Sequence, residues 1–315
     1  METPILVPSP GMEPHLGHFR TALRDKDGRD LPAYLITSPE YAMKRLLAAG
    51  HSRVFEITRC FRNDEPWDGS HNPEFTMIEW YRTGVDYRTI MRDTEEMVSE
   101  VAIRTVGRAD LAYRGKPIDL TPPWPRLSVA EAFDRHAGID LLSGIDDPEA
   151  FAAAARTEGI EVGPDDGFDD VFFKVFLHDI EPHLGQGRPA ILHDYPRSMA
   201  ALARLKPGEP RLAERFEVYC AGLELANAFS ELNDPEEQER RLVQEREERR
   251  RAGKDTPPLD RAFLEAVGSM PDAAGIALGV DRLVMLLTDA PSIRDVLFFP
   301  AGELFGATSG EGATN

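Results

Sequence analysis

Two arginines of this 315-residue chain lie in settings that favour an anionic partner. Arg62 ends an apolar, strand-like run, and its planar guanidinium could hold a phosphate. Arg282 falls in the first turn of an apolar helix pattern, where the helix dipole disfavours a cation. The run 275–279 before it contains two glycines, which allow a backbone to approach a flat ligand such as a purine. A phosphate suits this setting better than a protein carboxylate, which is the alternative partner of Arg282.

One carboxylate adds a position that could bind a cation. Side chains alternate along a strand, so Phe75, Met77, Glu79 and Tyr81 of the predicted strand 75–82 share one face. An acidic group among apolar neighbours is costly unless it is paired or hydrogen-bonded. Glu79 therefore pairs either with an arginine of the protein or with the ammonium group of a ligand.

Composition limits the classes of function. The chain has 36 basic and 55 acidic residues, a net charge of −19. Nucleic-acid affinity depends largely on Lys and Arg that neutralise phosphates, so a general RNA or DNA binder is disfavoured. The two cysteines, Cys60 and Cys220, belong to no paired motif, and neither a disulfide framework nor a cysteine zinc site is expected. No apolar run could span a bilayer and no signal peptide is present, which predicts a cytoplasmic protein without a membrane partner.

Other catalytic motifs are not found. The eight histidines form no HExxH or cysteine-containing ligand spacing, so zinc catalysis is not expected. The sequence contains neither a nucleophile elbow for Ser-His-Asp hydrolysis nor a Walker loop.

Local signals predict the elements that position these residues. Ser38-Pro39-Glu40 begins a helix that ends at Gly50, because Ser suits the N-cap and Pro the first helical position. A strand over 54–62, with Phe55, Ile57 and Phe61 on one face, and the strand over 75–82 predict an antiparallel hairpin with a long polar loop. Further predictions are helices over 86–106 and 281–287, strands over 216–220, 223–226 and 275–280, and a charged helix over 233–251 that reads as a solvated face.

These residues together resemble a known family. Phe61-Arg62-Asn63-Asp64 leading to His71-Asn72-Pro73-Glu74-Phe75-Thr76 resembles motif 2 of the class II aminoacyl-tRNA synthetases of the lysine, aspartate and asparagine group. The run 275–282 resembles their motif 3, and Thr3-Pro4-Ile5-Leu6 resembles the end of their motif 1. The resemblance extends to about Phe298 and is weak only in the middle. It implies an α+β fold, an antiparallel sheet flanked by helices, with 1–315 as one catalytic domain, 107–210 as a helical middle segment, and no anticodon-binding domain.

Within that group the chain is most similar to the lysyl-tRNA synthetase paralogues that modify elongation factor P. The phrases that carry this similarity are Ser38 to Leu47, Glu79-Trp80-Tyr81 and Gly222 to Asn227. The resemblance implies activation of lysine, in the form (R)-β-lysine, as an adenylate made with ATP and Mg²⁺. The acceptor it implies is a lysine side chain of elongation factor P, with no stable tRNA binding and a homodimeric assembly.

The resemblance also assigns roles by position. Arg62 would bind the α-phosphate and Arg282 the γ-phosphate, as the two catalytic residues. The other implied ATP-binding residues are Asn63, Asp64, His71, Asn72, Phe75, Glu224, Leu225 and Gly279. The implied substrate-binding residues are Ser38, Pro39, Glu40, Glu79, Tyr81, Glu231 and Ala277. Glu217 and Glu224 would hold Mg²⁺, which favours hard oxygen ligands that bridge to phosphates.

Several positions depart from the family pattern. The loop 63–72 is one residue longer than the family's, Asp64 replaces a family Glu, and Ser70 stands where relatives often carry Arg or Tyr. Ala277 matches the paralogues where lysyl-tRNA synthetases usually have Gly, and its methyl group favours β-lysine over α-lysine by about 1–3 kcal/mol. The chain also begins within motif 1; if Met1 is an internal start, the natural protein is longer.

Three alternatives remain open. The first is a lysyl-tRNA synthetase fragment that charges tRNA, which the acidic balance disfavours. The second is an amide-forming relative of the asparagine-synthetase type, which Glu79 and Glu231 disfavour because they suit a cationic side chain. The third is a catalytically inactive module that binds a partner or an amino acid, which the intact arginines and acidic pair disfavour.

Overall fold

The computed structural model describes residues 1–67 and 69–306. Contacts divide the chain into two compact units. Unit 1 consists of Met1–Thr83, Asn233–Pro271 and Ala277–Asn315, and unit 2 consists of Gly84–Leu232 and Asp272–Ile276. Each unit is thus assembled from stretches that are far apart in the sequence, and the fold belongs to the α+β class.

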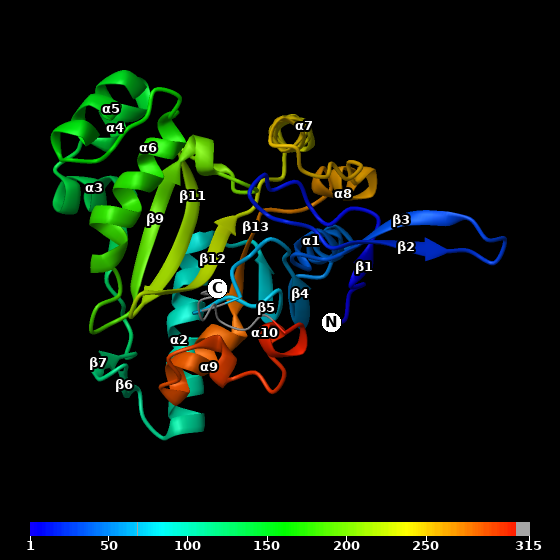
Figure 1. Cartoon of the computed structure of the whole chain (residues 1–315), viewed down its shortest axis with the longest axis horizontal. Helices are drawn as coiled ribbons and strands as arrows, with labels where there is room; N and C mark the ends of the chain where they lie inside the picture. The colour runs from blue at the N-terminus through cyan, green and yellow to red at the C-terminus, as the bar shows by residue number, and fades with distance from the viewer. Residues whose placement is uncertain (68, 307–315) are drawn as a thin grey trace, which may run out of the picture. The chain divides into compact units, whose positions relative to one another are not determined.

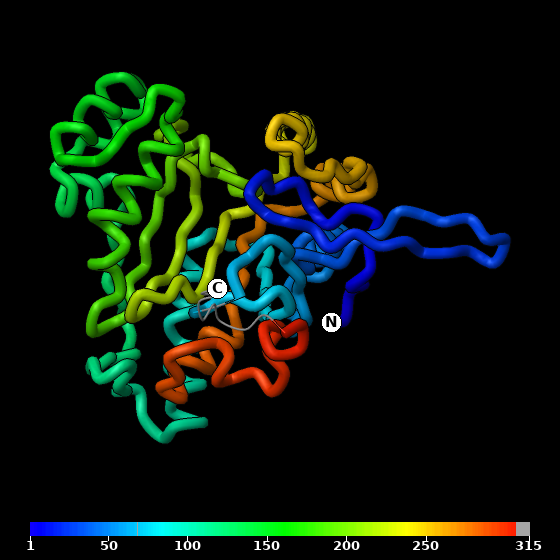
Figure 2. Tube along the Cα trace, viewed as in Figure 1, coloured from blue at the N-terminus to red at the C-terminus, as the bar shows by residue number. Residues whose placement is uncertain are grey.

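Unit 1 contains two groups of strands. β1 (Leu6–Val7), β3 (Asp30–Leu35) and β2 (Arg20–Arg24) form an antiparallel sheet in the order β1-β3-β2. The β2–β3 hairpin is a long ribbon that extends outward from the rest of unit 1 (Figures 1 and 2). The second group has the order β4-β5-β13, from β4 (Arg53–Phe61), β5 (Glu74–Thr83) and the end of β13 (Ala273–Gly279). β4 and β5 pair in antiparallel register from Arg53 opposite Arg82 to Phe61 opposite Glu74, which confirms the predicted hairpin.

The helices of unit 1 begin and end at residues that satisfy their backbone groups. α1 (Glu40–Ala48) begins one residue later than predicted, with Pro39 and not Ser38 as its N-cap, although the Ser38 hydroxyl still accepts from the Glu40 N–H. Asp234 caps α7 (Pro235–Arg251) by accepting from two N–H groups of its first turn. Tyr41 of α1 stacks on Phe263 of α8 (Arg261–Val267) with ring centroids 3.9 Å apart. The remaining helices are α9 (Val280–Thr288), the 3₁₀ turn Ile293–Asp295 and α10 (Ala301–Leu304).

Burial distinguishes the two faces of β4 and of α7. Phe55 and Ile57 share a face of β4, as predicted; each is 59% exposed, and the buried face carries Val54, Glu56 and Cys60. The charged helix α7, expected to present a solvated face, also has a buried stripe. Arg249 is 1% exposed and Leu242 is also buried, because one stripe of the helix packs on unit 1.

Unit 2 contains a mixed sheet in which β13 is followed by β12, β11, β9 and β8. β11 (Glu209–Cys220) pairs antiparallel with β12 (Leu223–Ser230) and with β9 (Ala190–Pro196), whereas β8 (Arg126–Ser128) runs parallel to β9. The short β10 (Leu205–Lys206) pairs with β11, and β6 (Asp110–Tyr113) with β7 (Lys116–Asp119) forms a separate hairpin. The two predicted strands around Ala221-Gly222 are confirmed and are longer than expected.

Helices cover this sheet. α2 (Tyr87–Val106) begins at Asp86 and ends at Gly107, whose φ of 84° is a conformation that glycine adopts easily. The middle segment 107–210, expected to be helical, contains the strands β6 to β10 as well as several short helices: α3 (Val129–Ala137), α4 (Leu141–Asp146), α5 (Pro148–Thr157), α6 (Phe168–Val175), the π-helix Phe176–Ile180, and the 3₁₀ turns Glu181–His183 and Arg197–Met199. In the described part of the chain, no helix is long and apolar enough to cross a membrane.

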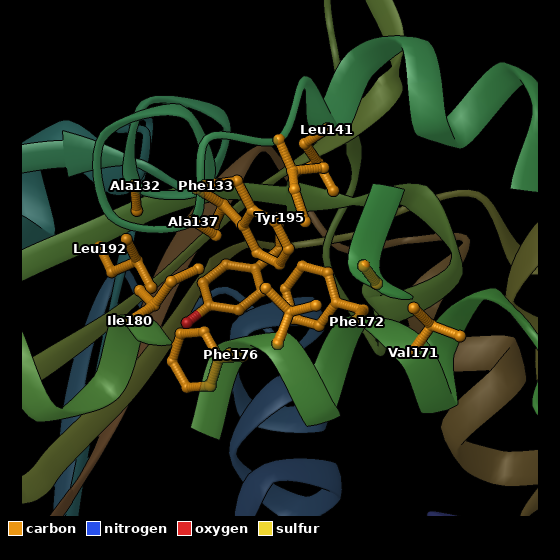
Figure 3. Close-up of a cluster of buried hydrophobic side chains, with 14 of the residues drawn as sticks. Ala132, Phe133, Ala137, Leu141, Val171, Phe172, Phe176, Ile180, Leu192 and Tyr195 are labelled. Carbon is orange, nitrogen blue, oxygen red and sulfur yellow. The ribbon is translucent and has the colours of Figure 1, made fainter. Parts of the chain in front are cut away.

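An aromatic core holds the middle segment together. The rings of Phe133 and Phe172 lie 4.7 Å apart, and Phe172 stacks on Phe176 at 5.9 Å. Figure 3 shows Tyr195 of β9 among these rings, with Leu192 and Ile180 beside them. Because packed rings fix one another, this core sets the position of the Tyr195 side chain.

Candidate functional site

Arg62 lies at the mouth of the β4–β5 hairpin, as predicted. Its backbone N–H donates to the Pro73 carbonyl oxygen (2.9 Å), which closes the loop 63–72. Its guanidinium carbon lies 5.2 Å from the centroid of the Phe75 ring, a cation–π contact. The buried Nε of Arg62 has no hydrogen-bond partner among residues 1–67 and 69–306. A positively charged donor that is held in place but not used is suited to bind an anion.

Arg282 reaches the loop of the same hairpin from α9. Its Nη2 lies 3.2 Å from Nε2 of His71, and its Nε donates to the Ser70 carbonyl oxygen at 3.4 Å. The same Nε2 atom of His71 lies 3.8 Å from the Glu65 carboxylate. The structure therefore brings both predicted catalytic arginines to one loop of unit 1.

Asp281 fixes the helix that carries Arg282, a role that the sequence did not indicate. Its Oδ2 accepts from the Thr76 N–H of β5 at 2.6 Å, which ties the start of α9 to the strand beside Phe75. Burial raises the pKa of this carboxyl group, and the Thr76 N–H opposes the rise. Gly279, the predicted nucleotide-backing residue, is the N-cap of α9, and a side chain there would contact the Arg282 methylenes at 3.6 Å.

The two ends of the loop 63–72 are held by backbone contacts. Asn63 donates its N–H to the Gly17 carbonyl oxygen (3.0 Å), and a Cβ at Gly17 would lie 2.2 Å from the Asn63 oxygen, so only glycine fits. The Asn72 amide donates to the Glu74 carbonyl oxygen and accepts from the Ala301 N–H. Asn72 thus shapes the loop, whereas Asn63 and Asp64 are exposed. The predicted ATP contacts of these three residues stay predictions.

Glu79 lies on the same face of β5 as Met77 and Tyr81 and is fully buried. The Ser38 hydroxyl donates to Oε1 at 2.6 Å, and the Tyr81 hydroxyl donates to Oε2 at 2.7 Å. Glu79 and Tyr81, two of the three residues expected to receive the ε-ammonium of the substrate, are therefore in direct contact, and Ser38 joins them. These two hydroxyl donors orient the carboxylate.

Glu40, predicted to take another amino group of the substrate, already contacts a cation of the protein. Its Oε1 lies 2.7 Å from Nζ of Lys44, which is 1% exposed. The pair is spaced i, i+4 on α1, and burial strengthens such a contact. An incoming amino group would share Glu40 with Lys44. Pro39, the N-cap residue of α1, places Glu40 in the first turn.

A second buried carboxylate faces Glu79 and was missed from sequence. Glu56 lies directly opposite Glu79 in the β4–β5 ladder and is 2% exposed. Its Oε1 accepts from the Thr3 N–H at 2.8 Å, while Oε2 has no hydrogen-bond partner within the described residues. The inward alternation of Val54, Glu56 and Cys60 was the signal that could have found it.

Ala277 lies on the same side of unit 1 as this pocket. It packs against the buried cluster of Ile36, Cys60 and Met77, together with Phe75. Its methyl group therefore adds volume beside the strand that carries Glu79. This placement fits the predicted effect of Ala277 on the shape of the substrate pocket.

Unit 2 carries the predicted metal ligands. The Glu217 Oε2 accepts from the hydroxyls of Tyr195 and Tyr219, each at 2.5 Å, and Oε1 accepts from Arg215 Nη2 at 2.5 Å. Arg215 also lies over the Tyr195 ring, 4.5 Å from its centroid. Burial, and then the charge of Glu217, raises the pKa of both tyrosines well above its usual value, so they stay protonated donors.

Glu224 acts on the same groups. Its negative charge helps to raise the pKa of Tyr195, of Tyr219 and of Arg215. A register shift in the β11–β12 ladder sets Glu224 opposite Tyr219. Leu225 and Glu231 are buried in unit 2 at 2% and 1% exposure. The expectation that strand neighbours limit the exposure of the acidic residues holds, with Glu224 only half-buried.

These residues fit Mg²⁺ in combination with a phosphate ligand. In the described part of the chain, no group of three or more His, Cys, Asp or Glu side chains could hold a metal ion. Mg²⁺ is commonly bound by one or two carboxylates together with substrate phosphates, and Glu217 and Glu224 supply that number. Arg215 already neutralises Glu217, so an ion would replace or share this contact.

Comparison with known proteins identifies the family of this chain. Residues 1–303 match the family model "tRNA synthetases class II (D, K and N)". The chain belongs to this class II synthetase family. It is 41% identical over 305 residues to the lysine–tRNA ligase of Pelotomaculum thermopropionicum, an alignment that covers 95% of this chain and 58% of that protein. It is 42% identical to the lysine–tRNA ligases of Moorella thermoacetica (93% of this chain, 60% of that protein) and Rhizobium meliloti (96% and 59%).

The match to the synthetase family covers most of this chain but only part of each relative. The chain spans about three fifths of the length of these curated relatives. The family resemblance inferred from motifs 1, 2 and 3 is confirmed. The relatives are named for lysine and for tRNA, and their names carry no information about a protein acceptor.

Proposed function

We propose that this chain uses ATP and Mg²⁺ to activate a lysine-type amino acid as its adenylate. The observation that carries the proposal is Glu79, a buried carboxylate that accepts from the Ser38 and Tyr81 hydroxyls and suits the ammonium end of such a substrate. Membership of a family whose similar relatives are lysine–tRNA ligases supports it. Ala277 supports (R)-β-lysine as the preferred isomer, because its methyl group packs against the cluster that includes Met77, on the strand that carries Glu79.

The reaction needs no nucleophilic side chain of the protein. The carboxylate of the amino acid attacks the α-phosphorus of ATP, the bond to the β-phosphate oxygen breaks, and pyrophosphate leaves. Arg62 stabilises charge on the α-phosphate, and Arg282 stabilises charge on the leaving pyrophosphate. Mg²⁺, held by Glu217 and Glu224, would add positive charge at the phosphate oxygens. The acceptor amine then attacks the adenylate carbonyl, loses a proton, and AMP leaves.

For the acceptor we propose a lysine side chain of elongation factor P, with a homodimer acting in the cytoplasm. The net charge of −19 supports a protein acceptor over an RNA acceptor, because tRNA binding gains most of its affinity from basic residues. The second candidate is tRNA charging, and the identity of 41–42% to lysine–tRNA ligases favours it.

Pyrophosphate exchange with purified chain tests the first step. We expect exchange that depends on lysine or (R)-β-lysine, and a lower KM for the β-isomer. Arginine and leucine are controls, since one has a different cationic head and the other has none. Absence of exchange with every lysine isomer would reject adenylate formation, and a clear preference for α-lysine would reject the isomer assignment.

A second assay separates the acceptors. The chain is incubated with ATP, the preferred isomer and either elongation factor P or lysine tRNA. We expect a mass increase of one lysyl residue on elongation factor P, stable to mild base. Charging of tRNA, detected as a base-labile ester, without modification of elongation factor P would favour the second candidate.

A further inference from the structure

A surface groove in unit 1 lies apart from the candidate site. Its volume is about 800 Å³, and it is lined by the base of the β2–β3 hairpin, the end of α7 and the loop that follows α7. Its charged lining residues are Arg20, Arg246, Arg250 and Asp255. Three guanidinium groups around one carboxylate make the groove basic in a chain whose net charge is −19.

The arginines of the groove are weakly neutralised. Arg20 lies 3.8 Å from Asp255, with side chains 61% and 38% exposed, and such surface pairs contribute little. Arg250 contacts Glu247, which does not line the groove. The positive potential of the groove therefore remains available to an anionic partner.

The rest of the lining is apolar and stiff. Pro8, Pro32, Pro257 and Pro258 contribute rings, and Leu31 is 48% exposed. Leu31 pairs across the hairpin with Leu23, which is 51% exposed, so the apolar surface continues onto β2. Such a surface accommodates an aliphatic side chain.

The aromatic residue of the groove is not a stacking surface. Tyr34 is only 3% exposed, so its ring face does not meet solvent. Binding of single-stranded RNA relies on exposed aromatic faces together with a basic track. The combination of arginines with aliphatic and proline surface fits an acidic protein segment better.

The wall of the groove is fixed before any partner binds. Arg249 donates to the carbonyl oxygens of Asp255, Glu13 and Leu16 at 2.7 Å each. Lys254 donates to the carbonyl oxygens of Pro14 and His15. The loop that carries Asp255 and the prolines is thus tied to the N-terminal segment. A preformed surface loses less conformational entropy on binding.

From these observations we infer that the groove docks an acidic segment of a partner protein. Carboxylates of the segment pair with Arg20, Arg246 and Arg250, and an aliphatic side chain packs on Leu31 and the prolines. This inference does not depend on adenylate formation, because none of these residues belongs to the candidate site.

Fluorescence anisotropy tests the docking with a labelled synthetic peptide of alternating Glu and Leu, on the full chain. We expect binding that weakens with salt, and a loss of about tenfold or more in affinity for Arg246→Glu and for Leu31→Asp. Arg246→Gln, which removes the charge without reversing it, shows a smaller loss. The matched control is Arg240→Glu, which makes the same charge change on an exposed part of α7 outside the groove and leaves affinity within about twofold.

Three results would overturn the inference. The first is absence of peptide binding at low salt. The second is an equal loss of peptide affinity for Arg240→Glu, which would show that affinity depends only on the net charge of the chain. The third is tighter binding of a labelled single-stranded RNA than of the peptide, lost in Arg246→Glu, which would assign the groove to nucleic acid. Melting temperatures of all variants exclude unfolding as the cause, and pyrophosphate exchange is unchanged by these variants.

Discussion

Arg62 and Arg249 are both held inside unit 1, yet their donors are used differently. Arg249 is 1% exposed, and its Nε and Nη1 donate to three backbone carbonyl oxygens that come from two distant segments. Arg62 is half-buried, lies over Phe75, and keeps an Nε without a partner among the described residues. A guanidinium whose donors are all used supports the fold, whereas one that is fixed but incompletely used is ready for a ligand.

The surroundings of the two arginines differ in the same way. Around Arg249, the partners are carbonyl groups of the chain and the His18 ring, whose Nδ1 lies 3.1 Å from Nη2. Burial, and then the charge of Arg249, lowers the pKa of His18 to about 4, so at neutral pH this ring is uncharged and can accept. Around Arg62, the contact is the Phe75 ring, and Nε has no hydrogen-bond partner among the described residues, so an anion could supply one.

The largest effect is expected for Arg62→Ala. The rate of pyrophosphate exchange should fall by about 10³, or about 4 kcal/mol, because one preorganised charged donor to the transition state is lost. The free energy of unfolding should change by less than about 1 kcal/mol, since the half-buried guanidinium makes a cation–π contact with Phe75 and its Nε bonds no group of the described residues. Arg59→Ala is the matched control on the same strand, 50% exposed and 3.7 Å from Glu74. A large loss of stability in Arg62→Ala would remove the contrast with Arg249.

Arg249→Met should reverse the pattern. Three buried carbonyl oxygens would lose a charged donor, and the free energy of unfolding should fall by about 3 kcal/mol in urea titrations. Exchange by the folded fraction should remain. Arg250→Met, next in sequence and 62% exposed, should stay within about 0.5 kcal/mol of the parent chain. If Arg249→Met were as stable as the parent chain, the hydrogen bonds of Arg249 would make no net contribution to the free energy of unfolding.

Glu79→Gln extends the contrast to carboxylates. The amide can still bond Ser38 and Tyr81, but it loses the charge that would attract an ammonium group. We expect the KM for lysine to rise by about 30-fold, or about 2 kcal/mol, with the KM for ATP unchanged. Glu74→Gln, on the same strand but exposed, is the control. An equal rise in both KM values would indicate a structural role for Glu79.

The smallest effect concerns pH and the region of Arg249. Burial raises the pKa of Glu245 on α7 to about 8, and the charges of Glu13 and Glu248 add to the rise. The folded chain therefore holds this proton more tightly than the unfolded chain, whose pKa is near the ordinary 4.5. The resulting stability is fully present below about pH 4.5 and is lost as pH rises through about 8.

Urea unfolding at pH 6 and pH 7 measures this contribution. The parent chain should lose up to about 1.4 kcal/mol per pH unit more than Glu245→Gln. Glu247→Gln, whose side chain is 42% exposed, should follow the parent. Parallel pH profiles for the parent and Glu245→Gln would show that this carboxyl is ionised in the folded chain.

Much of the candidate site in unit 1 could be predicted from the sequence. Strand alternation placed Met77, Glu79 and Tyr81 on one face, and the hairpin placed Arg62 at its mouth. These predictions succeeded because neighbours within one hairpin are fixed by local periodicity. Alternation also placed Phe55 and Ile57 on one face of β4, but it could not tell that this face is the exposed one, since alternation defines two faces and not which one is covered.

The middle segment shows the opposite case. Its helices are too short to be stable alone, and their stability comes from an aromatic core that includes Phe133, Phe172 and Tyr195 (Figure 3). Tyr195 links this core to the candidate metal site, because its hydroxyl donates to Glu217. Sequence reasoning named Glu217 as a metal ligand but could not find Tyr195 or Arg215, whose contact with it depends on packing.

By itself the sequence determined the family, the hairpin, the two arginines and the carboxylates that could bind a cationic substrate, because these follow from motifs and from periodicity within short segments. Only the tertiary structure decided which of these groups has a partner already. Asp281 bonds Thr76 across 205 residues, and Arg249 bonds Glu13 across 236. Contacts between such distant residues are set by how the elements pack, so no local pattern records them.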